Sequence, residues 1–517
     1  MLNIPLRNVY LILITISSAA VLGRITTLED YSAVGLETYR INRALEVKTA
    51  QWKARGFSEE SIAEKRQRYY QENVEKLQTR RPTLSANDRS RWALIRALVE
   101  PEMRVPGAPY AIDRVIAQRG WDTIDMVKHN GHLYSSKPPL LPTIQAGIYW
   151  TLVQTTGMTC QTHPFQCVRI VTALSHLPCL ILFFVMVILT VQQLTISSFA
   201  RVFIASAACL GTYLTTFAIS LQNHLPGAAA VAVALYAIVK IVLDNPLPFF
   251  NKTDNSAEPV NESRFYSLRG GSGRSLLIYF IAGLFSCFAI ACELPALAFF
   301  AAIALVCTLI DWRKTLTAFL PGCLIVLAGF LITNYAAHKT IIPPYAQRQE
   351  GNNWYMYTYD RGDGVIRQSY WHNRVGIDKG EPSRARYAFH ALFGHHGIFS
   401  LTPLWTFSIA GAFIWICRWK TDKKMAALGF FILSMSIIVI GFYLMRPLID
   451  RNYGGVTCAF RWAFWLIPLW LIALIPVLEK ARSNKWLTGA VYAALFWSVL
   501  CANTALVNPW THPWLYY

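Results

Sequence analysis

Residues 131–150 read GHLYSSKPPLLPTIQAGIYW. Lys137 and two prolines open an apolar run, 139–156, that is almost long enough to cross a bilayer, because a spanning helix needs about 20 residues. This run decides the topology of the chain. If it crosses, every loop that follows it moves to the opposite side of the membrane.

Apolar runs of spanning length recur throughout the 517 residues, of which 54% are hydrophobic and 15% charged. The runs are continuous rather than alternating, so helices satisfy their backbone in lipid better than a barrel would. Leaving 139–156 aside, we predict eleven spans, at 7–23, 167–194, 201–219, 225–243, 275–291, 294–311, 317–336, 397–417, 425–445, 462–478 and 487–505. The predicted fold class is an all-α polytopic membrane protein with about eleven transmembrane helices.

The distribution of Lys and Arg settles whether 139–156 crosses, because inner loops of membrane proteins are enriched in these residues. With this run outside the membrane and the N-terminus inside, the inner loops hold fifteen basic residues and the short outer loops hold only Arg446, Arg451 and Arg461. A crossing at 139–156 would reverse this bias. We therefore predict an interfacial helix on the outer surface, with Pro138 and Pro139 at its start.

This topology divides the chain into five parts. They are the first transmembrane helix (1–23), an outer loop with a helical hairpin and the interfacial helix (24–166), transmembrane helices 2–7 (167–337), a second outer loop (338–396), and transmembrane helices 8–11 with an outer tail (397–517). The first outer loop begins with two charged helices broken at Gly56, which we interpret as an accessory element.

The net charge of +19 is interpreted as that of a membrane protein, in which basic loops fix orientation and meet anionic headgroups. We therefore expect a lipid bilayer as partner and no nucleic acid. The sequence contains neither a P-loop nor a GxGxxG motif, which disfavours nucleotide-driven transport.

Unusual polar residues collect in motifs that this topology places on the outer face. Glu293 lies between two apolar runs, where a carboxylate is costly to bury, so it is a functional candidate unless it is merely paired. His395 and His396 are candidate ligands or general bases, or simply hydrogen-bonded residues. The outer-face candidates are Asp88, Lys137, Arg169, Asn223, His224, Glu293, His395, His396, Arg451, Tyr453 and Arg461.

Two of these motifs, NDRSRW at 87–92 and YSSKPPLLP at 134–142, resemble the C-type glycosyltransferase superfamily. The resemblance covers roughly residues 86–230 and is greatest to the dolichyl-phosphate-mannose protein mannosyltransferases and the bacterial lipid A aminoarabinose transferases. It implies a sugar donor on a polyprenyl-phosphate carrier and inversion at the anomeric carbon. It also implies an active site on the outer face of a membrane, which for a bacterial chain is the periplasmic face of the inner membrane.

Matched residue by residue, the resemblance gives Asp88 the role of catalytic acid and Lys137 that of contact to the carrier phosphate. Arg169 stands where an arginine opens the second span. Asn223 or His224 stands at the outer turn where many members carry a further Asp. Asp88 follows the first predicted span by about 65 residues, whereas the acid of the family follows it closely, so Asp30 is an alternative catalytic acid.

This chain departs from the family by having Asp88-Arg89 in place of an acid pair, and Asn223-His224 at the outer turn. Hard divalent cations prefer several carboxylates, so a metal cofactor is possible but not favoured. The predicted function is transfer of a sugar to an acceptor hydroxyl on a glycan, lipid or protein, with Asp88 as general base. The alternatives are a transporter or flippase for a lipid-linked substrate, or a non-catalytic member of the same fold.

Overall fold

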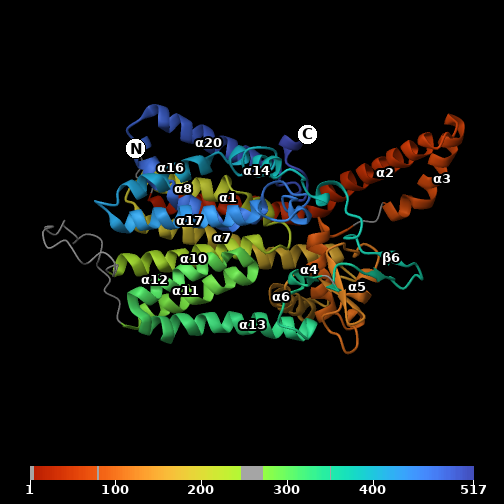
Figure 1. Cartoon of the computed structure of the whole chain (residues 1–517), viewed down its shortest axis with the longest axis horizontal. Coiled ribbons are helices and arrows are strands. Elements are labelled where there is room, and N and C mark those ends of the chain that lie inside the picture. Colours follow the sequence, from red (N-terminus) through yellow and green to blue (C-terminus); the bar gives the residue numbers. More distant parts are fainter. Residues whose placement is uncertain (1–4, 78–80, 246–271, 350) are drawn as a thin grey trace.

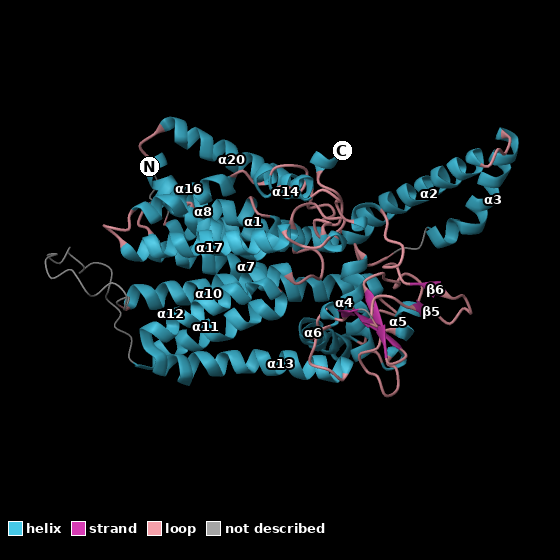
Figure 2. Ribbon diagram, viewed as in Figure 1, coloured by secondary structure: helices cyan, strands magenta, loops and turns pink. Residues whose placement is uncertain are grey.

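The computed structural model describes residues 5–77, 81–245, 272–349 and 351–517. Within these ranges the side chains of 29–41, 72–77 and 272 are not described. Figure 1 shows a long bundle of helices with a smaller layer of helices and short strands at one end, and Figure 2 shows that the strands are confined to that layer.

The described chain holds nine stretches that are long and apolar enough to cross a membrane, and one of them, Leu294–His338, has 45 residues. A straight helix of that length would measure about 68 Å, more than twice the hydrocarbon thickness of about 30 Å. The chain instead kinks at Asp311 (φ −153°, ψ 91°), passes through a π-helical turn, Thr315–Phe319, and turns back. This stretch therefore crosses twice.

Together with the shorter apolar helix α16, the described residues form eleven crossings, as the sequence predicted. The crossings are α1 (Leu6–Thr26), α7 (Pro164–Leu194), α8 and α9 (Ser198–Leu210, Tyr213–Phe217), α10 (His224–Asp244), α11 (Ser272–Cys292), α12 (Leu297–Lys314), α13 (Leu320–His338), α16 (Leu404–Cys417), α17 (Lys423–Leu444), η8 with α18 and α19 (Arg461–Leu466, Ile467–Ala473, Ile475–Ala481) and α20 (Lys485–Thr504). The chain is an all-α polytopic membrane protein.

Close approach between helices depends on small residues, as is usual where lipid removes the hydrophobic driving force. A Cβ on Gly411 would lie 1.8 Å from the Ala473 carbonyl oxygen, and one on Gly283 would lie 2.0 Å from that of Phe319. At the outer end of the bundle, a Cβ on Gly227 would lie 3.2 Å from Cys292 Cβ and from Glu293 Cγ. Gly227 thus lets the start of α10 lie against the end of α11, which positions Glu293.

The outer layer is built from α4 (Ala86–Val99), η1 (Pro101–Met103), α5 (Asp113–Ala117), β1 (Met126–His129), β2 (His132–Ser135) and α6 (Leu140–Thr156). The two strands are antiparallel and pair Met126 with Ser135. Their turn has positive φ at Asn130 (48°) and Gly131 (81°), which an Asn-Gly pair adopts readily in a two-residue hairpin. This hairpin was not among the elements predicted from the sequence.

Helix α6 is the run on which the topology depended, and both of its ends lie in the outer layer. It begins directly after Lys137, and it ends at Gly157 in the left-handed conformation (φ 71°). Beyond Gly157, the N–H of Cys160 donates to Glu100 at the end of α4 (3.1 Å). Figure 1 shows α6 beside α4 at the end of the bundle. Helix α6 is not among the stretches of the described chain that are long and apolar enough to cross a membrane.

The hairpin of the first outer loop projects away from the bundle (Figure 1) and consists of α2 (Leu28–Ala54) and α3 (Glu59–Leu77). The break lies at Gly56, where φ is 77°, as predicted. The Ser58 hydroxyl accepts from the Ser61 N–H at 3.3 Å at the start of α3. Only Thr27 separates α2 from α1.

The second outer loop contains short segments, some of which lie against the outer layer. They are η5 (Pro344–Ala346), β3 (Arg348–Gln349), β4 (Asn352–Asn353), β5 (Thr358–Tyr359), β6 (Arg367–Gln368), η6 (Gly376–Lys379) and α14 (Arg384–Leu392), and α15 (Ile398–Leu401) follows just after the loop. The Lys128 N–H donates to the Trp354 carbonyl at 2.9 Å, which joins this loop to the β1–β2 hairpin. Between α17 and η8 lies η7 (Leu448–Asp450), and after α20 lies η9 (Trp514–Tyr516).

Candidate active site

Helix α4 begins with a capped first turn that contains Asp88. The Ser85 hydroxyl accepts from the Asp88 N–H (3.0 Å), and the Asp88 carboxylate reaches back to the Leu84 N–H (3.4 Å), which is a variant of the capping box. The other Asp88 oxygen accepts from the Leu221 N–H at 3.2 Å, in the turn before α10. Asp88 therefore ties the outer layer to the bundle, and its side chain is only 2% exposed.

Burial raises the pKa of Asp88 to about 7, against the lowering effects of the Leu84 and Leu221 N–H groups and of Arg91. A carboxyl with a raised pKa in the folded chain stabilises the fold as the pH falls, because the folded chain takes up a proton before the unfolded chain does.

We expect the melting temperature of the wild type, relative to that of Asp88→Asn, to rise as the pH falls from 8 to 5. Thermal unfolding of both proteins in one detergent at each pH measures this difference, since every other group titrates alike in the two chains. An identical pH dependence of the two proteins would contradict the raised pKa.

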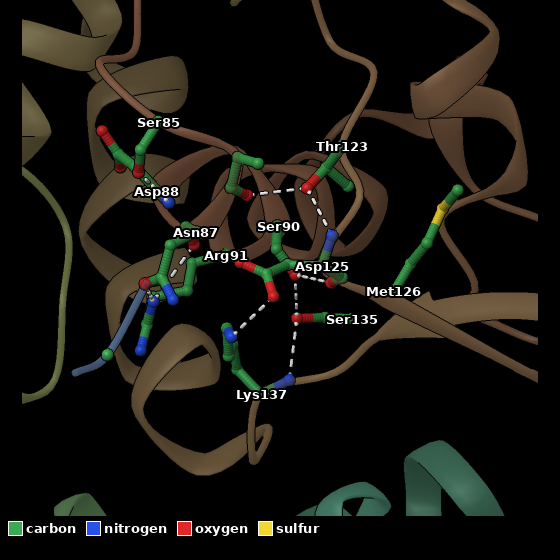
Figure 3. A network of polar contacts seen from close by, with 12 residues as sticks. Ser85, Asn87, Asp88, Ser90, Arg91, Thr123, Asp125, Met126, Ser135 and Lys137 are labelled. Carbon is green, nitrogen blue, oxygen red and sulfur yellow. Dashed lines mark hydrogen bonds and ion pairs between the residues drawn. The ribbon is translucent and has the colours of Figure 1, made fainter. Parts of the chain in front are cut away.

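Lys137 lies against a carboxylate that the sequence analysis did not select. Its Nζ is 3.1 Å from Asp125 Oδ1, and both side chains are largely buried (20% and 15% exposed). The pairing of Met126 with Ser135 places Asp125 and Lys137 at the same end of the hairpin. Figure 3 shows the two side chains meeting, and shows Asp88 apart from them beside Ser85.

Two serines hold this pair in place. The Ser90 hydroxyl, on α4, donates to the Asp125 carbonyl (2.5 Å) and lies 2.7 Å from the Ser135 hydroxyl. The Ser135 hydroxyl accepts from the Lys137 N–H (3.2 Å). The hydrogen bonds drawn in Figure 3 thus join α4 to the backbone at both ends of the pair.

The charges of this pair perturb each other. Burial lowers the pKa of Lys137 to about 8, although Asp125 opposes that shift. Burial acts to raise the pKa of Asp125. The positive charges of Lys137, Arg461 and Arg91 lower it by more, so the pKa of Asp125 lies below its ordinary value. Asp125 is thus ionised near neutral pH and within electrostatic reach of three cations.

A second set of contacts brings the bundle ends to the same place. The Arg91 guanidinium, on α4, donates to Asn87 Oδ1 and to Asn223 Oδ1, each at 2.5 Å. Asn223 Nδ2 donates in turn to Glu293 Oε1 (2.7 Å), and His224 Nδ1 hydrogen-bonds the same oxygen. Glu293 is therefore paired rather than isolated.

Arg461 completes this network from the start of η8. Its guanidinium lies 2.7 Å from His224 Nε2 and donates to the Gly454 carbonyl oxygen (3.1 and 2.7 Å). It also lies over the Trp510 ring, 5.1 Å from the centroid. We call the assembled group the outer polar cluster: Arg91, Asp125, Lys137, Asn223, His224, Glu293 and Arg461.

The other predicted site residues lie elsewhere. His396 stacks on Tyr453 (ring centroids 4.9 Å apart) and contacts His395, next to Gly454 but outside the cluster. The Arg451 guanidinium donates to the carbonyls of Glu381 and Pro382 (3.2 and 2.8 Å) and so anchors the second outer loop.

Two further candidates are placed as follows. Arg169 is half-buried near the beginning of α7. Asp30 lies in α2, but its side chain is outside the described residues.

Sequence reasoning missed Arg91, Asp125 and Asp378. Asp378, in η6, accepts from Tyr370 (2.8 Å) and Asn452 (3.0 Å), and it lies within electrostatic reach of Asp125 and Arg461. The Asn-Gly pair at 130–131 was the available signal for Asp125, since a two-residue hairpin sets the strand register. No local sequence pattern predicts that Asp378 lies near this site.

Within the described part of the chain, no three His, Cys, Asp or Glu side chains are placed to hold one metal ion. The four carboxylates of this region each have a partner already: Lys137 for Asp125, backbone N–H groups for Asp88, Asn223 and His224 for Glu293, and Tyr370 and Asn452 for Asp378.

Neither a protein-family model nor a curated protein matches the sequence. Among solved structures, the oligosaccharyltransferase of Archaeoglobus fulgidus in its apo form is similar, with a TM-score of 0.39 and 14% identity, over 83% of this chain and 51% of that one. For the form tethered with an acceptor peptide containing the NVT sequon, the TM-score is 0.41 and the identity 13%, over 86% of this chain and 56% of that one. For the complex with an inhibitory peptide and a dolichol-phosphate, the TM-score is 0.37 and the identity 13%, over 83% of this chain and 56% of that one.

This chain thus spans about half the length of those proteins. Their name places them among glycosyltransferases, the enzyme class that the sequence resembles. Similarity at these TM-scores carries no function over to this chain.

Proposed function

We propose that this protein is an integral membrane glycosyltransferase that moves a sugar from a polyprenyl-phosphate carrier to an acceptor hydroxyl. The observation that carries the proposal is the gathering of one ammonium and two guanidiniums in one largely buried cluster at the outer ends of the helices, those of Lys137, Arg91 and Arg461. Three cations at this depth suit a lipid phosphate, because its headgroup lies at the same boundary.

The three cations have distinct tasks in this proposal. Lys137 has one ionic partner, Asp125, and serves as the direct contact to the phosphate. Arg91 and Arg461 are fixed by amide, imidazole and carbonyl groups, so they supply positive charge without reorganising. Preorganised charge of this kind stabilises a leaving group as negative charge develops on it.

The chemistry is a single displacement. The acceptor oxygen attacks the anomeric carbon, the bond from that carbon to the phosphate oxygen breaks, and its electron pair stays on the phosphate. The configuration inverts, and the acceptor proton passes to a carboxylate. Asp88 is the candidate from the sequence, with a pKa of about 7 that suits a base, and Asp125 is the candidate from the contacts of Lys137.

The site lies on the side of the membrane opposite to the basic inner loops, which in a bacterial cell is the periplasmic side of the inner membrane. The acceptor is a hydroxyl of a glycan, lipid or protein on that side.

The test uses the purified protein in liposomes that contain a polyprenyl-phosphate sugar with a radiolabelled sugar. We expect label to move covalently to an added hydroxyl acceptor, with polyprenyl phosphate as the second product and an inverted anomeric centre by NMR. Movement of intact donor between leaflets without bond cleavage would establish a flippase instead. Donor that binds but is never consumed would establish a non-catalytic member of the fold.

A further inference from the structure

The carboxylates around the outer polar cluster differ in how fully they are engaged. Asp88 accepts backbone N–H groups on both oxygens and is 2% exposed. Asp378 also has a partner on each oxygen, Tyr370 and Asn452. Glu293 gives one oxygen to both Asn223 and His224 and is 6% exposed. None of these three offers an accessible, unengaged oxygen beside Lys137.

Asp125 differs from the other three. Its Oδ1 meets Lys137 at 3.1 Å, whereas its Oδ2 accepts no hydrogen bond from the described residues, and the side chain keeps 15% of its surface exposed. The Ser90 hydroxyl donates to the Asp125 backbone carbonyl, and this contact helps to hold the carboxylate in one orientation. It is thus an oriented carboxylate with a free oxygen, next to the ammonium assigned to the carrier phosphate.

We propose that Asp125 is the general base of the transfer, and that it is released for this role when the donor phosphate displaces it from Lys137. This inference rests on the proposed glycosyl transfer. The ion pair of the carrier-free protein occupies Lys137 with a carboxylate oxygen, the same kind of acceptor that a phosphate oxygen provides. Exchange of one for the other leaves the Asp125 carboxylate ionised beside the anomeric carbon.

The proton balance supports this order of events. The acceptor O–H gives its proton to Asp125, the new bond forms from the acceptor oxygen to the anomeric carbon, and the departing electron pair ends on the phosphate, which Lys137, Arg91 and Arg461 offset. A bound phosphate also adds negative charge near Asp125 and so raises its pKa towards neutrality, where a base is most effective. Without donor, Lys137 keeps Asp125 a weak base.

The test compares Asp125→Asn with Asp122→Asn in the liposome assay. Asp122 lies three residues earlier and pairs with Arg81 (2.9 Å) outside the cluster, so it is the matched control. We expect Asp125→Asn to lower kcat for transfer by about 10²–10⁴-fold, the usual contribution of a general base, with KM for the donor unchanged or lower because Lys137 is no longer shielded. We expect Asp122→Asn to transfer normally.

Azide separates loss of a base from loss of structure, because this anion attacks without a proton to lose. With Asp125→Ala and azide in place of the acceptor, we expect formation of the glycosyl azide at a rate near that of wild-type transfer. For a variant that folds poorly, Asp125→Glu retains the carboxylate and should recover part of kcat. The inference is overturned if Asp125→Asn keeps kcat within threefold of the wild type, or if azide rescues Asp88→Asn and not Asp125→Ala. A wild type that never consumes donor would instead reject the proposed function itself.

Discussion

Replacing Lys137 with Met is expected to lower sugar transfer by about 10³-fold, at the upper end of what the loss of one preorganised donor to a developing anion costs. The side chain keeps a similar length and apolar volume, but the phosphate loses its direct cationic contact. Arg91 and Arg461 are held by other groups and do not reach into the vacated position without breaking those contacts. The initial rate of transfer at saturating acceptor, together with KM for the donor, measures the effect.

The matched control is Lys128→Met. Lys128 lies on the same hairpin, and its ammonium donates to the Thr358 carbonyl oxygen (2.8 Å) rather than to the cluster, so we expect near-normal transfer. Lys137→Arg keeps the charge with a different shape and should fall between the two. Transfer by Lys137→Met within tenfold of the wild type would remove Lys137 from the donor site.

The second large effect is on stability and concerns Glu100, at the end of α4. Glu100 pairs with Arg96 at 2.6 Å, and both side chains are almost completely buried (2% and 1% exposed). Its Oε1 also accepts from the Tyr149 hydroxyl (2.5 Å) and the Cys160 N–H (3.1 Å). Glu100→Ala leaves the Arg96 charge buried without its carboxylate, which is expected to lower the free energy of unfolding by about 3–5 kcal/mol.

Thermal unfolding of the detergent-solubilised protein measures this effect as a lower melting temperature. Glu102→Ala is the control, because that carboxylate is exposed two residues further on and its loss should change stability by no more than about 0.5 kcal/mol. The double variant Arg96→Met, Glu100→Leu removes both charges and should be more stable than Glu100→Ala. Equal melting temperatures for Glu100→Ala and Glu102→Ala would mean that the pair contributes little.

The spans were predictable because lipid leaves few ways to satisfy a backbone. A continuous apolar run such as 225–243 has little alternative to a helix, and α10 follows it within one residue at each end. The basic inner loops also predict that 139–156 lies outside the membrane; α6 occupies this run, and its interfacial position stays a prediction. These features depend on residues close together in the chain, so the sequence displays them directly.

The cluster was only partly predictable, because it joins residues that are far apart in the chain. Lys137, Asn223, His224, Glu293 and Arg461 were selected individually, and the structure brings them together. Asp125 escaped notice because its partner is set by a strand register, and Asp378 because a loop fold sets its place. The base assignment to Asp88 stays a prediction, to be decided against Asp125 by the azide experiment.

The position of α6 has a consequence for the surroundings of the protein. Ile144 and Trp150 project from this helix with about half of their surface uncovered (50% and 55%). In the interfacial position that we predict for α6, these side chains set its depth at the level where headgroups meet acyl chains. Lys137 directly precedes the first turn of α6, so its depth in the membrane follows that of α6. The depth of Glu293 and Arg461 is set instead by the helices of the bundle. Since adapting to a mismatched thickness costs fractions of a kcal/mol per Å, the alignment of the cluster, and with it the turnover, should depend on the acyl-chain length of the host bilayer.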